Sequence, residues 1–189
     1  MILNDKFFGT LTKTYFNRYE TVSNINFIGI QNEIELKFET FSDEDLKYFS
    51  EEGIYEEYNN ELLFEEYSTI YQSFIKNLDK ITPEILQAIR KYQNECYDDS
   101  DYTSSFKYFE NDKDVIENIE LLQITFQIDP FGVVKDTKLY KEMVKDKENE
   151  LKCMVLVFNA EWGNDDYRLL SVAIVNEKVV YVSEENLSD

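Results

Sequence analysis

The fold is decided by the stretch Met154-Val155-Leu156-Val157-Phe158, which is apolar at every position. A strand with one face in water alternates between apolar and polar residues, whereas a continuous apolar run is typical of a strand buried on both faces. Burial of both faces needs a covering layer, which helices packed on the sheet would supply. We therefore expect this stretch to be a strand inside the fold.

Strand patterns occur on both sides of this stretch. Residues 34–38 and 122–128 alternate between apolar and polar side chains, which is the period of a half-buried strand. Further strands are expected within residues 7–16, 25–30, 169–175 and 179–182 from their apolar and β-branched content. The short polar segments Gln31-Asn32-Glu33 and Asn176-Glu177-Lys178 are typical of hairpin turns.

Two helix patterns lie between the strand-rich halves. Apolar residues recur at steps of three and four from Leu63 to Leu78, and again from Ile85 to Cys96. Thr82-Pro83-Glu84 is typical of a helix start, so only three or four residues would separate the helices and they should be antiparallel neighbours. The order β, α, β predicts a single α+β domain over residues 1–189, with a mainly antiparallel sheet and an antiparallel helix pair packed on one face.

The charge balance restricts the function. The chain has 39 acidic residues, 19 basic residues and no histidine, which gives a net charge of −20, and its 43% apolar residues argue against disorder. This charge repels phosphate backbones and anionic membranes, so we expect neither direct nucleic-acid binding nor a membrane partner. No leader and no long apolar run is recognisable, which indicates a cytoplasmic protein. Cys96 and Cys153 are expected to be buried free thiols.

Catalytic and metal chemistry has little support in the sequence. Without histidine, neither a serine–histidine triad nor a zinc site can be assembled from two distant cysteines. Paired carboxylates could still hydrolyse glycosides or bind a divalent cation, but the acidic segments at 98–101 and 111–114 match no calcium loop. We expect no enzyme activity, cofactor or metal. A carboxylate-based hydrolase or divalent-metal-binding protein is the alternative, and a closed apolar pocket would instead favour a small-ligand protein.

An acidic, tyrosine-rich segment is the first candidate contact site. Ser42 and the acids after it are typical of a helix start, and Gly53 of a helix end. Carboxylates would pair with the lysines and arginines of a partner, and tyrosines would supply contact area. A solvated helix face that keeps the protein soluble is the competing interpretation. The candidate partner-binding residues are Asp43, Glu44, Asp45, Tyr48, Glu51, Glu52, Tyr55, Glu56, Glu57 and Tyr58.

A second candidate is the segment Glu161-Trp162-Gly163-Asn164-Asp165-Asp166, which holds the single tryptophan. Asparagine, glycine and aspartate suit a turn, so one interpretation is a hairpin connection whose tryptophan packs on the end of the sheet. The other is a contact loop, because tryptophan is enriched at binding hot spots and the neighbouring carboxylates attract cations. The candidate residues here are Glu161, Trp162, Asp165 and Asp166.

The order of these motifs resembles a bacterial family of unknown function that is often linked to polymorphic-toxin immunity genes. The resemblance comprises Phe8-Gly9-Thr10-Leu11, the helix pair, residues 121–128, and residues 155–162 followed by 167–182. Related sequences carry Glu-His-Gly after the tryptophan where this chain has Gly163-Asn164-Asp165-Asp166, so any role of that histidine is not transferred. The resemblance implies an immunity-type inhibitor that occludes a basic protein partner, such as a toxin or nuclease domain.

Overall fold

A computed structural model describes residues 2–14, 17–56, 58–99, 108–128, 132–144, 153–162, 167–184 and 187. The strands are β1 (Ile2–Asp5), β2 (Gly9–Lys13), β3 (Arg18–Phe27), β4 (Ile30–Glu39), β5 (Ile119–Gln127), β6 (Cys153–Glu161), β7 (Tyr167–Val175) and β8 (Lys178–Ser183). The helices are α1 (Asp43–Glu51), α2 (Asn60–Lys76), α3 (Leu78–Asp99), α4 (Asp112–Ile116), α5 (Gly132–Lys135) and α6 (Lys138–Val144).

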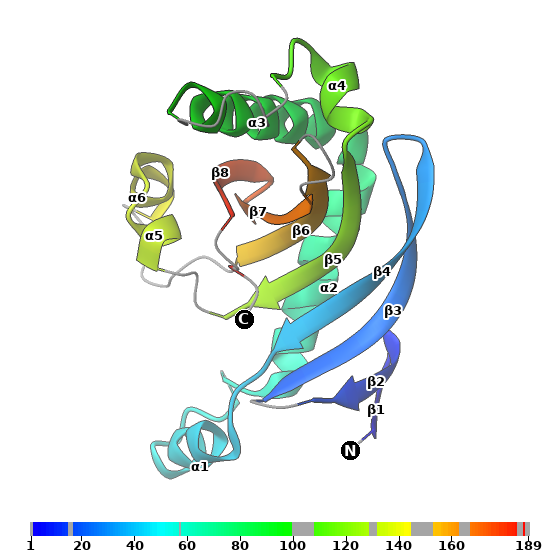
Figure 1. The fold of residues 1–189 in the computed structure, drawn as a ribbon. Coiled ribbons are helices and arrows are strands. Elements are labelled where there is room, and N and C mark those ends of the chain that lie inside the picture. Colours follow the sequence, from blue (N-terminus) through cyan, green and yellow to red (C-terminus); the bar gives the residue numbers. More distant parts are fainter. Residues whose placement is uncertain are drawn as a thin grey trace.

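Within the described residues, the strands form one eight-stranded sheet in chain order, β1 to β8. Neighbouring strands are antiparallel except β4 and β5, which are parallel. A parallel pair needs a long crossover, and the chain between β4 and β5 supplies one that contains α1 to α4 (Figure 1). The prediction of an α+β fold with a mainly antiparallel sheet is therefore confirmed.

The apolar stretch in β6 is buried on both faces of the sheet, as expected. Met154, Leu156 and Phe158 belong to the larger core, which also contains buried side chains of α2 and α3. Val155 and Val157 belong to a smaller core on the alternate face, together with residues of α5 and α6. Because successive side chains of a strand point to opposite faces, this division follows directly from the strand geometry.

Aromatic rings join the sheet to α2. Phe38 of β4 stacks on Phe126 of β5, with ring centroids 5.1 Å apart and an interplanar angle of 4°. Tyr67 of α2 contacts both rings, at 6.1 and 5.3 Å, and its hydroxyl donates to the Glu39 carbonyl. Burial raises the pKa of Tyr67 well above its usual value.

Two local predictions about the helices are wrong. Asn77 alone separates α2 from α3, and Figure 1 shows α3 running across the end of α2 rather than back along it. A one-residue connection is too short to reverse a helix, so the expected antiparallel arrangement is not observed. In addition, α3 begins at Leu78, so Thr82 and Pro83 lie inside the helix, where the Thr82 hydroxyl donates to the Leu78 carbonyl at 2.7 Å.

The first expected turn is also displaced. The β3–β4 hairpin turns at Ile28 and Gly29, with φ values of 53° and 80°, whereas Gln31-Asn32-Glu33 lies within β4. A two-residue hairpin of this kind needs positive φ at both positions, which Gly29 adopts at no cost and β-branched Ile28 adopts only with strain. The other hairpin turns at Asn176 and Glu177, within the segment expected to turn.

Candidate functional site

The acidic helix α1 is ordered by its own ends. Ser42 is its N-cap: its hydroxyl accepts from the Asp45 amide at 3.0 Å, and the Asp45 carboxylate accepts from the Ser42 amide at 2.9 Å. The Ser42 hydroxyl also donates to the Asp45 carboxylate at 2.6 Å, and this bond together with the one from the Ser42 amide lowers the pKa of Asp45. At the other end Gly53 has a φ of 76°, and the Ile54 amide donates to the Phe49 carbonyl at 2.9 Å. The expected start and end of this helix are confirmed.

None of the residues of α1 is buried. Tyr48, Tyr55 and Tyr58 are 57%, 46% and 36% exposed, and the carboxylates around them face solvent. Figure 1 shows α1 projecting from one end of the sheet. We define the α1 surface as the exposed candidates of this segment, which are Asp43, Glu44, Asp45, Tyr48, Glu51, Glu52, Tyr55, Glu56 and Tyr58. The candidate Glu57 lies outside the described residues.

Phe49 contacts two of the three tyrosines of the α1 surface, Tyr48 and Tyr58. Its ring contacts Phe41 at 5.1 Å, Tyr58 at 5.4 Å and Tyr48 at 6.1 Å, so the half-buried Phe49 and Phe41 join the segment to the end of β4. Lys47 is the only basic residue from Asp43 to Tyr58, and its ammonium lies 3.7 Å from Glu51. The arrangement is therefore an anionic surface with partly fixed aromatic rings.

Trp162 lies in the core and not on the surface. Its side chain is 1% exposed, with the Tyr92 ring of α3 at 5.9 Å and the Arg168 guanidinium at 5.5 Å. Arg168 in turn pairs with Glu184 at 2.8 Å. This agrees with the interpretation of a tryptophan packed on the end of the sheet, and we remove Trp162 from the contact residues. Its neighbour Glu161 is half-buried, and Asp165 and Asp166 lie outside the described residues.

The structure does not bring the two candidate segments together. The Glu161 amide donates to the Asn118 carbonyl at 2.8 Å, beside the start of β5. The Ile128 amide, beyond the other end of β5, donates to the Glu39 carboxylate at 2.8 Å, close to where α1 begins. At the rise of an extended strand, the length of β5 separates the two segments by roughly 26 Å. The α1 surface is therefore the candidate contact site on its own.

The described residues contain no group of three or more acids or cysteines placed to hold a metal ion. Within the same residues, no helix is long and apolar enough to cross a membrane. Cys153 is buried, and this burial raises the pKa of its thiol to about 12. Cys96 is only partly buried, in contrast to the expectation for both thiols.

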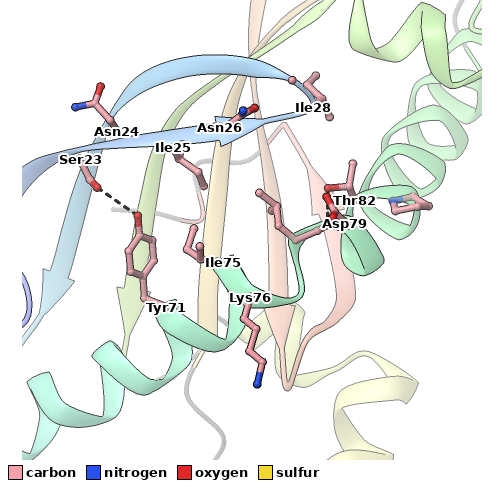
Figure 2. A pocket seen from close by; sticks show the side chains of 13 residues that line it. Ser23, Asn24, Ile25, Asn26, Ile28, Tyr71, Ile75, Lys76, Asp79 and Thr82 are labelled. Carbon is pink, nitrogen blue, oxygen red and sulfur yellow. Dashed lines mark hydrogen bonds between the residues drawn. The ribbon is translucent and has the colours of Figure 1, made fainter.

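Sequence reasoning missed a groove along the outer edge of β3. It encloses about 890 Å³ between the tip of the β3–β4 hairpin and the junction of α2 with α3. Figure 2 shows Ile25, Tyr71 and Ile75 directed into this space. The signal in the sequence is residues 21–27, which contain no charged side chain, whereas 31% of the whole chain is charged.

Comparisons with known proteins identify no relative. No model of a protein family, no curated protein and no solved structure matches this chain. The function proposed below therefore rests on the α1 surface, on the net charge and on the resemblance noted in the sequence.

Proposed function

We propose that this protein is an acidic, cytoplasmic binding protein of the immunity type, which inhibits a basic partner by covering it. The partner would be a toxin or nuclease domain whose active-site groove is cationic because it binds nucleic acid. The carboxylates of the α1 surface pair with lysines and arginines there, and its tyrosines lie against their side chains. Inhibition is steric and electrostatic, without catalysis.

The main support is that α1 is well capped but contains no fully buried residue. An element with no buried residue adds little to the stability of the core, because that stability comes mostly from removing apolar surface from water. The exposed Tyr48 and Tyr55 lose little conformational entropy on binding because they have few rotatable bonds. A capped helix that exposes tyrosines among carboxylates therefore suits recognition better than core formation.

The net charge supports the same proposal. A charge of −20 is above the magnitude of about 2–8 that keeps a small domain soluble. Complementary charge accelerates association from a typical 10⁵–10⁶ M⁻¹s⁻¹ to as much as about 10⁸–10⁹ M⁻¹s⁻¹ at low salt. Rapid capture is useful against a toxin that must be blocked before it acts. The resemblance to a family linked to immunity genes agrees with this proposal.

The test needs a basic toxin or nuclease domain as the partner, and the genes that neighbour the gene for this chain are searched for it first. In the α1 variant, four exposed acids become amides: Asp43→Asn, Glu44→Gln, Glu51→Gln and Glu52→Gln. Asp45 is left intact because it caps the helix. The control variant changes net charge equally but elsewhere, by Glu95→Gln, Glu110→Gln, Glu117→Gln and Glu120→Gln, which are all exposed.

We expect the α1 variant to associate about tenfold or more slowly at low salt and the control variant to stay within about threefold of the parent. Tyr48→Ala with Tyr55→Ala should accelerate dissociation, whereas Tyr167→Ala, at an equally exposed tyrosine, should not. Equal losses in both charge variants would refute the α1 surface as the contact site. An association rate that is independent of salt would refute the electrostatic mechanism.

A further inference from the structure

We infer that the outer edge of β3 is a docking site for an extended, basic peptide segment, which joins the sheet as an additional strand. The inference rests on the proposed function for the charge of the partner, and it adds where and in which conformation a segment of that partner binds. The site is the groove bounded by β3, α2 and the start of α3. Its evidence comes from strand pairing, from the walls of the groove and from charge.

The pairing leaves most of β3 open on one side. Among the described residues, β3 pairs with β2 only at Tyr19 and Glu20, whereas its pairing with β4 continues to Phe27. The two-residue turn makes Phe27 and Ile30 a hydrogen-bonded pair, so Ser23 and Ile25 also direct their backbone groups toward β4. The intervening residues direct theirs outward, and these are Val22, Asn24 and Asn26.

A contact farther along β3 supports this assignment. The Thr14 amide donates to the Arg18 carbonyl at 2.8 Å. The backbone carbonyl of Arg18, an even-numbered residue of β3, therefore points to the side where β2 lies. Beyond Glu20 the same side carries no described strand. Outward amide and carbonyl groups therefore recur at every second residue, which is the spacing that an added strand needs.

This edge lacks the features that usually prevent strand addition. Open edges are commonly protected by lysine, proline, a bulge or a short length. The segment from Thr21 to Phe27 has no charged residue and no proline, and its register with β4 is regular throughout. Val22, within it, is 58% exposed. An open edge of this length is a template for a partner strand.

The groove beside the edge has a wall that suits alternate side chains of such a strand. Ile25, Tyr71, Ile75 and Leu78 contribute apolar surface, and the Tyr71 hydroxyl lies 3.3 Å from Ser23 Oγ. Figure 2 shows the Lys76 ammonium directed away from the hairpin. One face of an extended peptide would therefore place apolar side chains in the groove, as in other complexes where a peptide lies between a strand edge and a helix.

The opposite face of the added strand would meet negative charge. Glu33 and Glu35 of β4 lie across from Asn24 and Val22 on the exposed face of the hairpin, and both are exposed. Lysine or arginine side chains on that face of the peptide would pair first with Glu33, because the Glu35 carboxylate already lies 3.4 Å from the Lys37 ammonium. A second copy of this chain is disfavoured as the occupant because each copy has a net charge of −20. The occupant is thus an extended segment that alternates apolar and basic residues.

The test uses a capped synthetic peptide of about seven residues, the length of the open edge, that alternates lysine and valine. Three further peptides are compared with it: one with the same residues in blocks, one methylated on its backbone nitrogens, and one with glutamate in place of lysine. We expect the alternating peptide to bind, and each of the other three to bind at least about tenfold more weakly. Equal binding of the block and methylated peptides would overturn the inference, because charge alone would then explain the affinity.

Two variants at Asn24 distinguish the contribution of the backbone amide to peptide binding from that of the side chain. Asn24→Pro removes an outward amide without removing a bond to β4, whereas Asn24→Ala removes only the side chain. We expect binding to fall about tenfold in Asn24→Pro and to stay within about twofold in Asn24→Ala. Loss of binding to the same extent in both variants would overturn the strand-addition geometry. Circular dichroism checks that both variants fold.

Amide exchange in the unmodified protein provides a readout that needs no variant. Added peptide should slow exchange at Val22, Asn24 and Asn26, and leave Ser23 and Ile25 unchanged because β4 already protects them. Slowed exchange at α1 alone would overturn this inference and leave the proposed function standing. Conversely, a result in which the α1 variant binds the peptide at β3 as tightly as the parent does would support the β3 site, even if the basic toxin does not contact α1. Concentration-dependent dimers paired through β3 would overturn the choice of a basic peptide.

Discussion

At the scale of single residues, the two cysteines occupy different environments. Cys153 begins the most buried strand and has an exposed fraction of 1%, whereas Cys96 lies on α3 and is only partly buried. Burial in an apolar core penalises the thiolate more than the thiol, which raises the pKa of Cys153 from 9.0 to about 12. The two thiols should therefore react at different rates, since the thiolate is the nucleophile.

We expect iodoacetamide at about pH 8 to modify Cys96 and to leave Cys153 unmodified until the protein unfolds. Mass spectrometry of the native and the urea-unfolded protein counts the modified sites, and Cys96→Ser serves as the control that should remain unmodified when native. Rapid modification of Cys153 in the native protein would contradict the buried environment described for it.

The same pKa predicts a loss of stability in alkali. The pKa of Cys153 is higher in the folded than in the unfolded protein, so the thiol ionises at lower pH when the protein is unfolded. The contribution of Cys153 to the free energy of unfolding is therefore fully present below pH 9 and is lost as the pH rises from 9 toward 12. The free energy of unfolding should fall by up to about 1.4 kcal/mol per pH unit in this range. The difference in slope between the parent and Cys153→Ala, measured by urea unfolding, isolates this contribution, because the buried Tyr67 contributes equally in both proteins.

At the scale of elements, α1 depends on its cap and on the half-buried Phe49 rather than on any fully buried residue. Ser42 and Asp45 satisfy each other's backbone amides, and no residue of the helix is buried. Loss of the cap should therefore open α1 locally and leave the core intact. The pKa of Asp45 is lowered in the folded state, so its contribution is present above its ordinary value of 3.8 and is lost as the pH falls through the folded pKa.

We expect Ser42→Ala to destabilise α1 by about 1 kcal/mol, which corresponds to roughly fivefold faster amide exchange in that helix. The midpoint of global unfolding should barely change because the cores of the protein are untouched. Ser50→Ala, an exposed serine in the last turn of the same helix, is the matched control and should leave exchange unchanged or slower. Equal acceleration by both substitutions would show that Ser42 has no special role.

The elements differ in how far sequence alone could predict them. The strand at 154–158 and the start of α1 at Ser42 were predictable because each has a local cause, a continuous apolar run or a capping residue. The turn at Ile28 was not, because a β-branched residue rarely adopts positive φ and no local pattern favours it. The junction of α2 with α3 at Asn77 was not predicted, because Thr82 and Pro83 are typical of a helix start but lie inside α3.

For the candidate site, composition predicted that the acidic segment is exposed, but it did not predict the burial of Trp162 or the place of the groove. The acidic segment after Ser42 is exposed as expected, since carboxylates are rarely buried without partners. The burial of Trp162 depends on Tyr92, which is far away in the sequence, so local composition could not decide it. The groove beside β3 depends on where β2 leaves the sheet, which is a property of the tertiary structure.

At the scale of the whole molecule, the net charge of −20 should act in opposite directions on stability and on binding. Like charges repel within the folded state, whereas the same charges attract a basic partner. Salt reduces the range of both effects, from about 30 Å at 0.01 M to about 3 Å at 1 M. Added salt should therefore stabilise the fold and weaken its association with cations.

We expect the urea midpoint to rise when sodium chloride increases from about 0.01 to about 0.5 M, because screening relieves repulsion among the acids. Potassium chloride at the same ionic strength should act alike, which separates screening from binding of a particular cation. A midpoint that stays constant or falls would indicate that the ion pairs of the fold, such as Arg168 with Glu184, outweigh its repulsions.

The single parallel contact between β4 and β5 has a consequence for the path of folding. It divides the sheet into two meanders, β1 to β4 and β5 to β8, each built from neighbours in the chain. Each meander can form from short-range contacts, but joining them closes a loop of about 80 residues that includes the first four helices. We expect the seam between the meanders to assemble last during refolding and to separate first when the two ends of the chain are pulled apart.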